Sequence, residues 1–301
     1  MEDMMYELLF FLEVLFSGLL TGTLYSLVAL GFVLIFKASG VFNFAQGAMM
    51  LFAALSLVGF QEMLGVHWTI AFVLTVALMV VVAWCIEKFV LGKLVNQEGI
   101  ILFMATIGIT FFLDGFGQTI WGSDIKTLDI GLPTGSIDLG GIFVDRLELV
   151  AGLTAAALVV SLAIFFNKTK IGRALRAVAD DHQAAMSVGI SLRTIWIIVW
   201  SVAGVVGLVA GIMWGSKLGV QFSLTLLALK ALPVLMLGGF TSIPGAIIGG
   251  LIIGAGEKLA EIYIGPFVGG AIENWFAYML AMAFLLVRPQ GLFGEKIIER
   301  V

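Results

Sequence analysis

The chain is poor in charged residues, histidine and cysteine, and each shortage excludes a class of protein. Only 12% of its 301 residues are charged, against about 25% in ordinary soluble domains. The single Cys85 excludes a disulfide within the chain. The two histidines, His67 and His182, fall in polar segments, and no H-E-x-x-H sequence occurs. We therefore expect neither a disulfide-bonded domain nor the common zinc-protease site.

Two signals of other functions are also missing. No G-x-x-x-x-G-K-[ST] phosphate loop occurs, so we expect the chain not to bind ATP in that manner. The first residues, MEDMMYE, are acidic, whereas a secretory signal begins with a basic region. We therefore expect the first hydrophobic segment to be retained. The net charge of −4 offers no argument for binding nucleic acid.

Apolar residues, in contrast, are abundant. They make up 61% of the chain, and the mean hydropathy is +1.12. Runs of roughly 18 or more apolar residues recur, and each is long enough for a membrane helix. Strands of a membrane barrel alternate apolar and polar residues, whereas a segment such as FVLTVALMVVVAW is apolar on every side. We predict an all-α polytopic membrane protein with about 8–10 transmembrane helices, forming a single transmembrane domain over residues 1–301.

The predicted spans follow the apolar runs. They are Leu8–Phe36, Asn43–Phe60, Trp68–Phe89, Ile100–Ile120, Leu147–Phe166, Thr194–Gly215, Leu224–Phe240, a Gly-rich segment Ile243–Ile262 that either crosses or re-enters, and Ile272–Val287. Lysine and arginine stay on the cytoplasmic side of a membrane protein. Their densest cluster lies in residues 167–193, which we therefore place inside, with the N-terminus outside and the tail, residues 288–301, inside.

Polar residues interrupt the first hydrophobic region at residues 37–47, in FKASGVFNFAQGAMM. Lys37 and Gly40 fit a plain turn between helices. Asn43 and Gln46, three residues apart, would share one face of the next helix. An amide without partners in hydrocarbon costs a few kcal/mol, so we expect both side chains to face protein or a wet cavity.

A second interruption lies at residues 230–250, in LKALPVLMLGGFTSIPGAIIGG. Paired hydrophobic segments broken by glycine and proline are the best sequence pointer to a transport pathway. Lys230 either reaches the outer surface with its ammonium group or lines that pathway. Asp114 and Glu257 are similar charged residues near predicted span ends. The residues expected at the two breaks are Gly40, Gly47, Pro233, Gly238, Gly239, Pro244 and Gly245.

The cytoplasmic loop 167–193 contains a moderately helical apolar pattern among charged residues. It is either a basic connector on the membrane surface or an amphipathic helix that docks on a soluble partner. Its stretch QAAMSVG resembles the EAA-x-x-x-G signature of ABC importer permeases, with Gln183 in place of the glutamate. The wider stretch GRALRAVADDHQAAMSVGI is similar to the permeases for branched-chain amino acids. So are SLVALGFVLIFKASGVFNFAQGAMM, LKALPVLMLGGFTSIPGAIIGGLIIGAGE and RPQGLFG.

The resemblance implies a permease subunit in the bacterial inner membrane that works by alternating access and is not itself an enzyme. It implies a second homologous permease, giving a heterodimer, two ATPase subunits that hold ATP and Mg²⁺, and an extracytoplasmic solute-binding protein; this chain would bind no cofactor. The implied ATPase-coupling residues are Arg173, Arg176, Asp180, Asp181, Gln183, Ala184, Ala185 and Gly189. The candidates for lining the pathway are Asn43, Gln46 and Lys230.

Other readings stay open. Related importers carry urea, short amides or small organic acids, and the residues named above do not exclude them. A self-sufficient channel or ion-coupled transporter would need buried carboxylates or a filter for its ion, and few carboxylates lie clearly within a span. An intramembrane enzyme lacks a serine or cysteine that pairs plausibly with a buried base.

Overall fold

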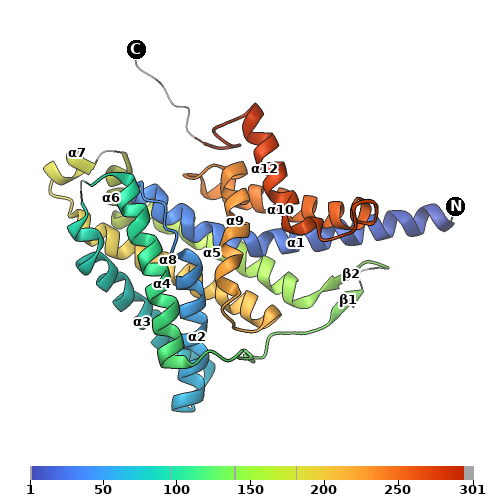
Figure 1. Cartoon of the computed structure of the whole chain (residues 1–301), viewed down its shortest axis with the longest axis horizontal. Coiled ribbons are helices and arrows are strands. Elements are labelled where there is room, and N and C mark those ends of the chain that lie inside the picture. Colours follow the sequence, from blue (N-terminus) through green and yellow to red (C-terminus); the bar gives the residue numbers. More distant parts are fainter. Residues whose placement is uncertain (1, 96, 139, 181, 295–301) are drawn as a thin grey trace. The chain divides into compact units, whose positions relative to one another are not determined.

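The computed structural model describes residues 2–95, 97–138, 140–180 and 182–294. Within these ranges, seven helices are long and apolar enough to cross a membrane, and two shorter apolar helices accompany them. The long helices are α1 (Glu2–Ser39), α2 (Gln46–Leu64), α3 (Trp68–Phe89), α4 (Gly99–Trp121), α5 (Arg146–Lys168), α8 (Leu192–Leu218) and α10 (Ile243–Tyr263). The shorter ones are α9 (Leu224–Gly238) and α12 (Phe276–Val287). The prediction of an all-α polytopic membrane protein is confirmed (Figure 1).

The remaining elements lie in the connections. They are the helices η1 (Leu91–Lys93), α6 (Lys170–Asp180), α7 (His182–Ser187), α11 (Gly265–Val268) and η2 (Ile272–Asn274), and the strands β1 (Ser136–Asp138) and β2 (Phe143–Asp145). The two strands form an antiparallel hairpin in which Ile137 faces Val144. This hairpin was not predicted, because strands of three residues are too short to show a clear alternation of apolar and polar residues.

Several predicted boundaries need correction. The second span begins at Gln46 rather than Asn43, and α12 begins at Phe276 after the short helix η2. The Gly-rich segment from Ile243 forms one continuous helix of 21 residues, which is long enough to span a bilayer. The chain divides into two compact units, which are described separately below; that residues 1–301 act as a single domain stays a prediction.

Unit 2 comprises residues 30–130 and 157–228. Helix α2 packs against α3, α4 and α8, and most of its residues are buried. Glycine allows α8 to approach α2 closely, because a Cβ added at Gly211 would lie 2.7 Å from the carbonyl oxygen of Met50. Helix α4 is mostly exposed, and Phe111 and Phe112 point outward. Such an apolar outer face suits hydrocarbon, in which a helix satisfies its own backbone.

Unit 1 comprises residues 1–29, 131–156 and 229–301, apart from those outside the described ranges. Helices α1 and α10 pack through small residues, so a Cβ added at Gly18 would lie 2.8 Å from the Cα of Ala255. Ser26 Oγ lies 2.9 Å from the carbonyl oxygen of Gly22 and 3.2 Å from that of Ala246. Close approach through glycine with added hydroxyl hydrogen bonds is the usual way helices associate in membranes.

Candidate functional site

The predicted coupling segment is helical. Helix α6 buries Leu175 and Val178, while Arg173 and Arg176 are exposed. Arg176 Nη1 donates a hydrogen bond to Asn167 Oδ1 at 3.0 Å. Of the two aspartates predicted in this segment, Asp181 and the side chain of Asp180 lie outside the described part of the chain.

Helix α7 presents most of its surface to solvent. Gln183, Ala184 and Met186 are exposed, and only Ala185 of the predicted coupling residues on this helix is buried. Val188, the residue after α7, is 76% exposed. The segment that carries the EAA-like sequence is therefore a short helix with one side exposed.

Gly189 ends α7 in a specific way. Its φ is +88°, its N–H donates to the carbonyl of Met186 at 3.0 Å, and the N–H of Ile190 donates to the carbonyl of Ala185 at 3.0 Å. This pair of bonds is a Schellman motif, which favours glycine because other residues are strained at positive φ. The glycine of the EAA-like sequence is thus a helix-terminating residue.

The connection from α7 to α8 is short and well fixed. Ser191 is the N-cap of α8 and accepts a hydrogen bond from the N–H of Thr194 at 3.4 Å. Two residues after this cap, Arg193 Nε donates to Glu87 Oε2 in α3 at 2.9 Å. A pocket of about 560 Å³ lies beside this pair and is also lined by Met186 and Gly189. Only residues 188–191 therefore separate α7 from the first turn of α8.

At the first break, the chain leaves α1 at Gly40, whose φ is +67°. Asn43 and Gln46 are fully buried. Asn43 Oδ1 accepts a hydrogen bond from the N–H of Ala45 at 3.1 Å, and Gln46 Nε2 donates to the carbonyl of Ala203 in α8 at 3.3 Å. These side chains hold the irregular backbone in place and bond it to a neighbouring helix.

Thr106 in α4 completes this arrangement, which we call the amide cluster (Asn43, Gln46 and Thr106). Its hydroxyl accepts from the N–H of Phe44 at 3.1 Å and lies 3.3 Å from the carbonyl oxygen of Phe42. Thr106 was not predicted, because a threonine inside an apolar span carries no mark of its partner. Asn43 was predicted to lie on the following helix, whereas it precedes α2.

Gly47 is not at a break, contrary to the prediction, since it is the second residue of α2. A Cβ added there would lie 2.5 Å from the carbonyl oxygen of Thr225 and 2.7 Å from the Cβ of Ala228. Gly47 therefore permits the close approach of the first residues of α9 to α2.

Lys230 belongs to a second group of polar side chains, which we call the charged cluster (Tyr25, Lys230 and Glu257). Lys230 Nζ lies 3.1 Å from Glu257 Oε1 in α10, and the side chains are 23% and 3% exposed. The hydroxyl of Tyr25 in α1 is also hydrogen-bonded to Glu257. The ammonium group thus pairs with a buried carboxylate instead of extending to the surface. Sequence spacing did not reveal this pair, although both charges were visible.

Pro233 does not break α9, contrary to the prediction, because the helix continues to Gly238. Proline lacks an N–H, so the carbonyl four residues earlier, that of Leu229, has no helical donor. Tyr278 in α12 supplies one, since its hydroxyl donates to that carbonyl at 2.7 Å. Prolines in membrane helices are tolerated where a neighbouring helix satisfies the freed backbone in this way.

The second break is confined to residues 239–242, between α9 and α10. Gly239 has a φ of +100°, while Gly238 is the last residue of α9. Pro244 and Gly245 are not breaks, contrary to the prediction, because they lie in the first turn of α10. There, proline is favoured because its missing N–H would have no helical partner in any case.

The C-terminal sequence RPQGLFG closes the second break. The N–H groups of Leu292 and Phe293 donate to the carbonyls of Leu237 and Gly238 at 2.8 and 3.1 Å. These are terminal carbonyls of α9, which have no partner within their own helix. The part of the tail that precedes residue 295 thus caps the end of α9. Residues 295–301 lie outside the described ranges.

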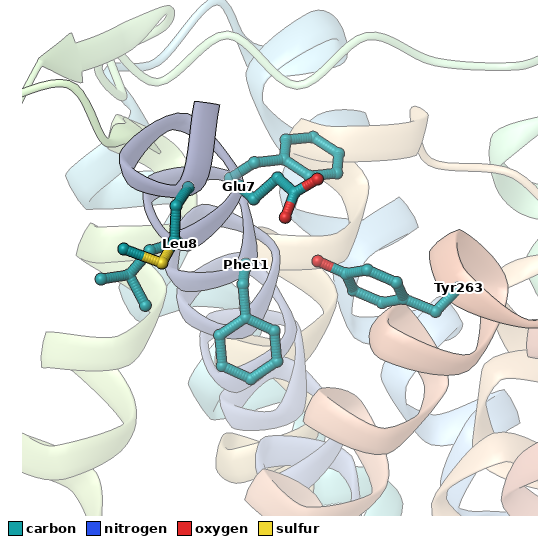
Figure 2. A pocket seen from close by; sticks show the side chains of 6 residues that line it. Glu7, Leu8, Phe11 and Tyr263 are labelled. Carbon is teal, nitrogen blue, oxygen red and sulfur yellow. The ribbon is translucent and has the colours of Figure 1, made fainter. Parts of the chain in front are cut away.

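Two further cavities contain none of the predicted pathway residues. One, of about 700 Å³, lies between the first turns of α1 and the end of α10, where Figure 2 shows Glu7, Leu8, Phe11 and Tyr263. The other, of about 710 Å³, is lined by apolar residues of α3 and α4. Among the described residues, no group of three His, Cys, Asp or Glu side chains could hold a metal ion.

Comparison with known proteins gives consistent results along almost the whole chain. The profile of the family described as "Branched-chain amino acid transport system / permease component" matches residues 14–288. The high-affinity branched-chain amino acid transport system permease protein LivH of Salmonella typhimurium is 27% identical, over 98% of this chain and 99% of LivH. BraD of Pseudomonas aeruginosa, described in the same words, is 26% identical over 99% and 100% of the two chains.

The fold is similar to that of one solved structure, PsaBC from Streptococcus pneumoniae in complex with Fab. The match covers 90% of this chain and 89% of the chain in that structure. Its sequence identity is 16% and its TM-score is 0.48.

Proposed function

Because the chain belongs to the family of branched-chain amino acid permeases, we propose that it is the transmembrane permease subunit of an ABC importer and forms part of the route for branched-chain amino acids. It is a multi-pass membrane protein, and its relatives LivH and BraD are transport proteins of bacteria. The chain therefore acts as a transport subunit in the bacterial inner membrane and forms no covalent bond with its solute.

The observation that carries this proposal is the exposed helix α7, which is formed by the EAA-like sequence. A short connection, fixed by hydrogen bonds, joins this helix to α8. ATPase subunits that bind ATP and Mg²⁺ dock on α7, and Arg173, Arg176 and Gln183 contribute to the contact. Movement of these subunits shifts α7, and Gly189 and the cap at Ser191 pass the shift to α8. Because Gln183 is neutral, docking depends on shape and apolar contact more than on a salt bridge at this position.

The two breaks are where the helices rearrange. Asn43 and Gln46 hold the first break against α8, so they shape the pathway as supporting residues. Lys230 is the candidate for contact with solute, since its side chain is partly exposed whereas Glu257 is buried. Irregular backbone at membrane depth is tolerated only where protein or water supplies hydrogen-bonding partners for its N–H and C=O groups. The hydrogen bonds at both breaks supply such partners.

We place the N-terminus outside and the C-terminus in the cytoplasm. Within unit 2, the pairing of Glu87 with Arg193 joins the end of α3 to the start of α8, two helix ends that this orientation assigns to the cytoplasmic side. Lys126 and Val220 form a backbone bridge between two connections assigned to the outside. Within unit 1, the tail contacts the break that follows α9, also on the cytoplasmic side. The lysine and arginine distribution supports the same orientation.

The complete importer contains a second homologous permease, two ATPase subunits and an extracytoplasmic solute-binding protein. The binding protein selects the solute, so urea, short amides or small organic acids remain alternatives to branched-chain amino acids. A thermal-shift screen of the cognate binding protein against these solutes separates the alternatives.

Reconstitution tests the proposal as a whole. Proteoliposomes that hold both permeases and both ATPase subunits are given the binding protein and labelled leucine. We expect uptake only with ATP and the binding protein present. Uptake by the 301-residue chain alone, driven by a solute gradient or by protons or sodium, would contradict the proposal.

A further inference from the structure

Arg193 and Glu87 join two helices at the point where α7 connects to the transmembrane part of unit 2. Their Nε and Oε2 atoms are 2.9 Å apart, and the arginine side chain is 55% exposed while the glutamate side chain is 3% exposed. A buried carboxylate is strongly unfavourable without its charged partner. The pair is therefore held in one geometry.

The local structure fixes both partners. Glu87 lies in the last turn of α3, and Gly92 in η1 packs against its carboxylate, because a Cβ added at Gly92 would lie 3.0 Å from Glu87 Oε1. Arg193 is the second residue of α8 and follows the N-cap Ser191. A residue placed between two fixed helix ends can transmit a displacement without first changing its own conformation.

Away from this pair, α3 also meets α8 through apolar contact. A Cβ added at Gly204 in α8 would lie 3.1 Å from the Cε of Met79 in α3, and both residues are buried. Apolar contact is non-directional, so it lets two helices slide along each other. A charge-assisted hydrogen bond is directional and stronger, and it opposes such sliding at this end of α3.

We propose that Glu87 is a positioning residue that makes the end of α3 move together with α7 and α8 when the ATPase subunits close. Arg193 is the link, because it lies directly after the connection to α7 and is bonded to α3. This inference rests on the proposed function, and in particular on ATPase docking at α7. It adds that α3, which lies outside the coupling loop in sequence, is part of the transmission.

The test uses the complete importer in proteoliposomes with Glu87→Gln, Arg193→Gln and the double variant. ATPase activity is measured with and without solute-loaded binding protein, together with complex yield. We expect each single variant to lower the ratio of stimulated to basal activity about tenfold, the size typical of coupled contacting residues. The double variant should be no worse than either single one, and its basal activity and complex yield should stay unchanged.

Glu98→Gln is the matched control, because Glu98 is exposed, lies in the connection that follows α3 and makes no capping hydrogen bond with its side chain. Normal stimulation in the variants of the pair, or single effects that multiply in the double variant, would overturn the inference. The double variant leaves no lone charge, so we expect it to assemble even if a single variant does not. Normal stimulation in the double variant would therefore overturn the inference by itself. Val188→Asp on the exposed end of α7 separates the two proposals: if it alone abolishes stimulation, docking stands and only the role of Glu87 fails.

Discussion

The amide cluster and the charged cluster solve the same problem by different chemistry. Both place polar side chains among membrane-spanning helices, where a polar group without a partner is costly. The amide cluster uses neutral groups that bond to backbone, as Gln46 does to Ala203. The charged cluster uses opposite charges on two helices, with Lys230 in α9 and Glu257 in α10.

This difference determines what each region can tolerate. Removing one partner from a neutral hydrogen bond leaves one unsatisfied group, whereas removing one partner from a buried ion pair leaves a lone charge. The first break is thus a firm attachment between α2 and α8. The junction of α9 and α10 depends on charge balance, so its stability is lost sharply if one charge is removed and is retained if both are.

The largest effect is expected for Lys230→Met. The substitution leaves the buried Glu257 carboxylate without its cation, so the free energy of unfolding should fall by about 3–5 kcal/mol. Chemical unfolding of the purified chain in detergent micelles measures this. Adding Glu257→Leu to Lys230→Met should restore most of the loss, because a neutral apolar pair needs no partner.

Lys258→Met provides the control for that prediction. Lys258 also pairs with a glutamate, Glu273, but both side chains are more than a third exposed. Its loss should therefore change stability by less than about 1 kcal/mol. Equal effects at Lys230 and Lys258 would show that the buried pair is no different from a surface pair.

A smaller effect is expected for Gln46→Leu at the amide cluster. The carbonyl of Ala203 and the amide of Asn43 each lose a hydrogen-bonding partner, which should cost about 1–3 kcal/mol. The same unfolding measurement applies. Gln118→Leu, at an exposed position of α4, should have almost no effect; a loss at Gln46 as large as at Lys230 would remove the distinction between the clusters.

The smallest effect is expected for Tyr278→Phe. The ring and its packing remain, but the carbonyl of Leu229 loses the donor that replaces the missing N–H of Pro233. The cost should be about 0.5–1.5 kcal/mol, the net value of one hydrogen bond. In a Pro233→Ala background, alanine restores the helical N–H donor to the carbonyl of Leu229. Tyr278→Phe should then leave the free energy of unfolding unchanged, and an equal loss in both backgrounds would contradict this role of the tyrosine hydroxyl.

Much of the fold follows from the sequence. Long apolar runs fix the spans because only helices satisfy their backbone in hydrocarbon. The first break was located within a few residues, whereas the second occupies only residues 239–242 of the predicted 230–250. Pairing between distant segments could not be predicted. Neither the partner of Glu257 nor that of Glu87 is visible in spacing, because each lies on another helix. Pro233 was misjudged for the same reason, since the donor that makes it tolerable comes from Tyr278.

The glycines show the same limit. Gly40 and Gly239 do lie at breaks with positive φ, but Gly47 serves close packing against residues that are distant in sequence. A glycine in a hydrophobic segment can either end a helix or permit the close packing of two helices. Sequence alone does not distinguish these two uses.

The most direct test of the account asks whether α7 touches the ATPase subunit. Cys85 is the only cysteine, so a Cys85→Ser background allows Val188→Cys to be placed alone on the exposed end of α7. A short crosslinker is added to the assembled, nucleotide-loaded complex, with Val160→Cys on the exposed side of α5 as the control. We predict a covalent product with the ATPase subunit from position 188 and none from position 160. A thiol at position 188 that stays uncrosslinked and fully accessible to a water-soluble maleimide in that complex would contradict the account.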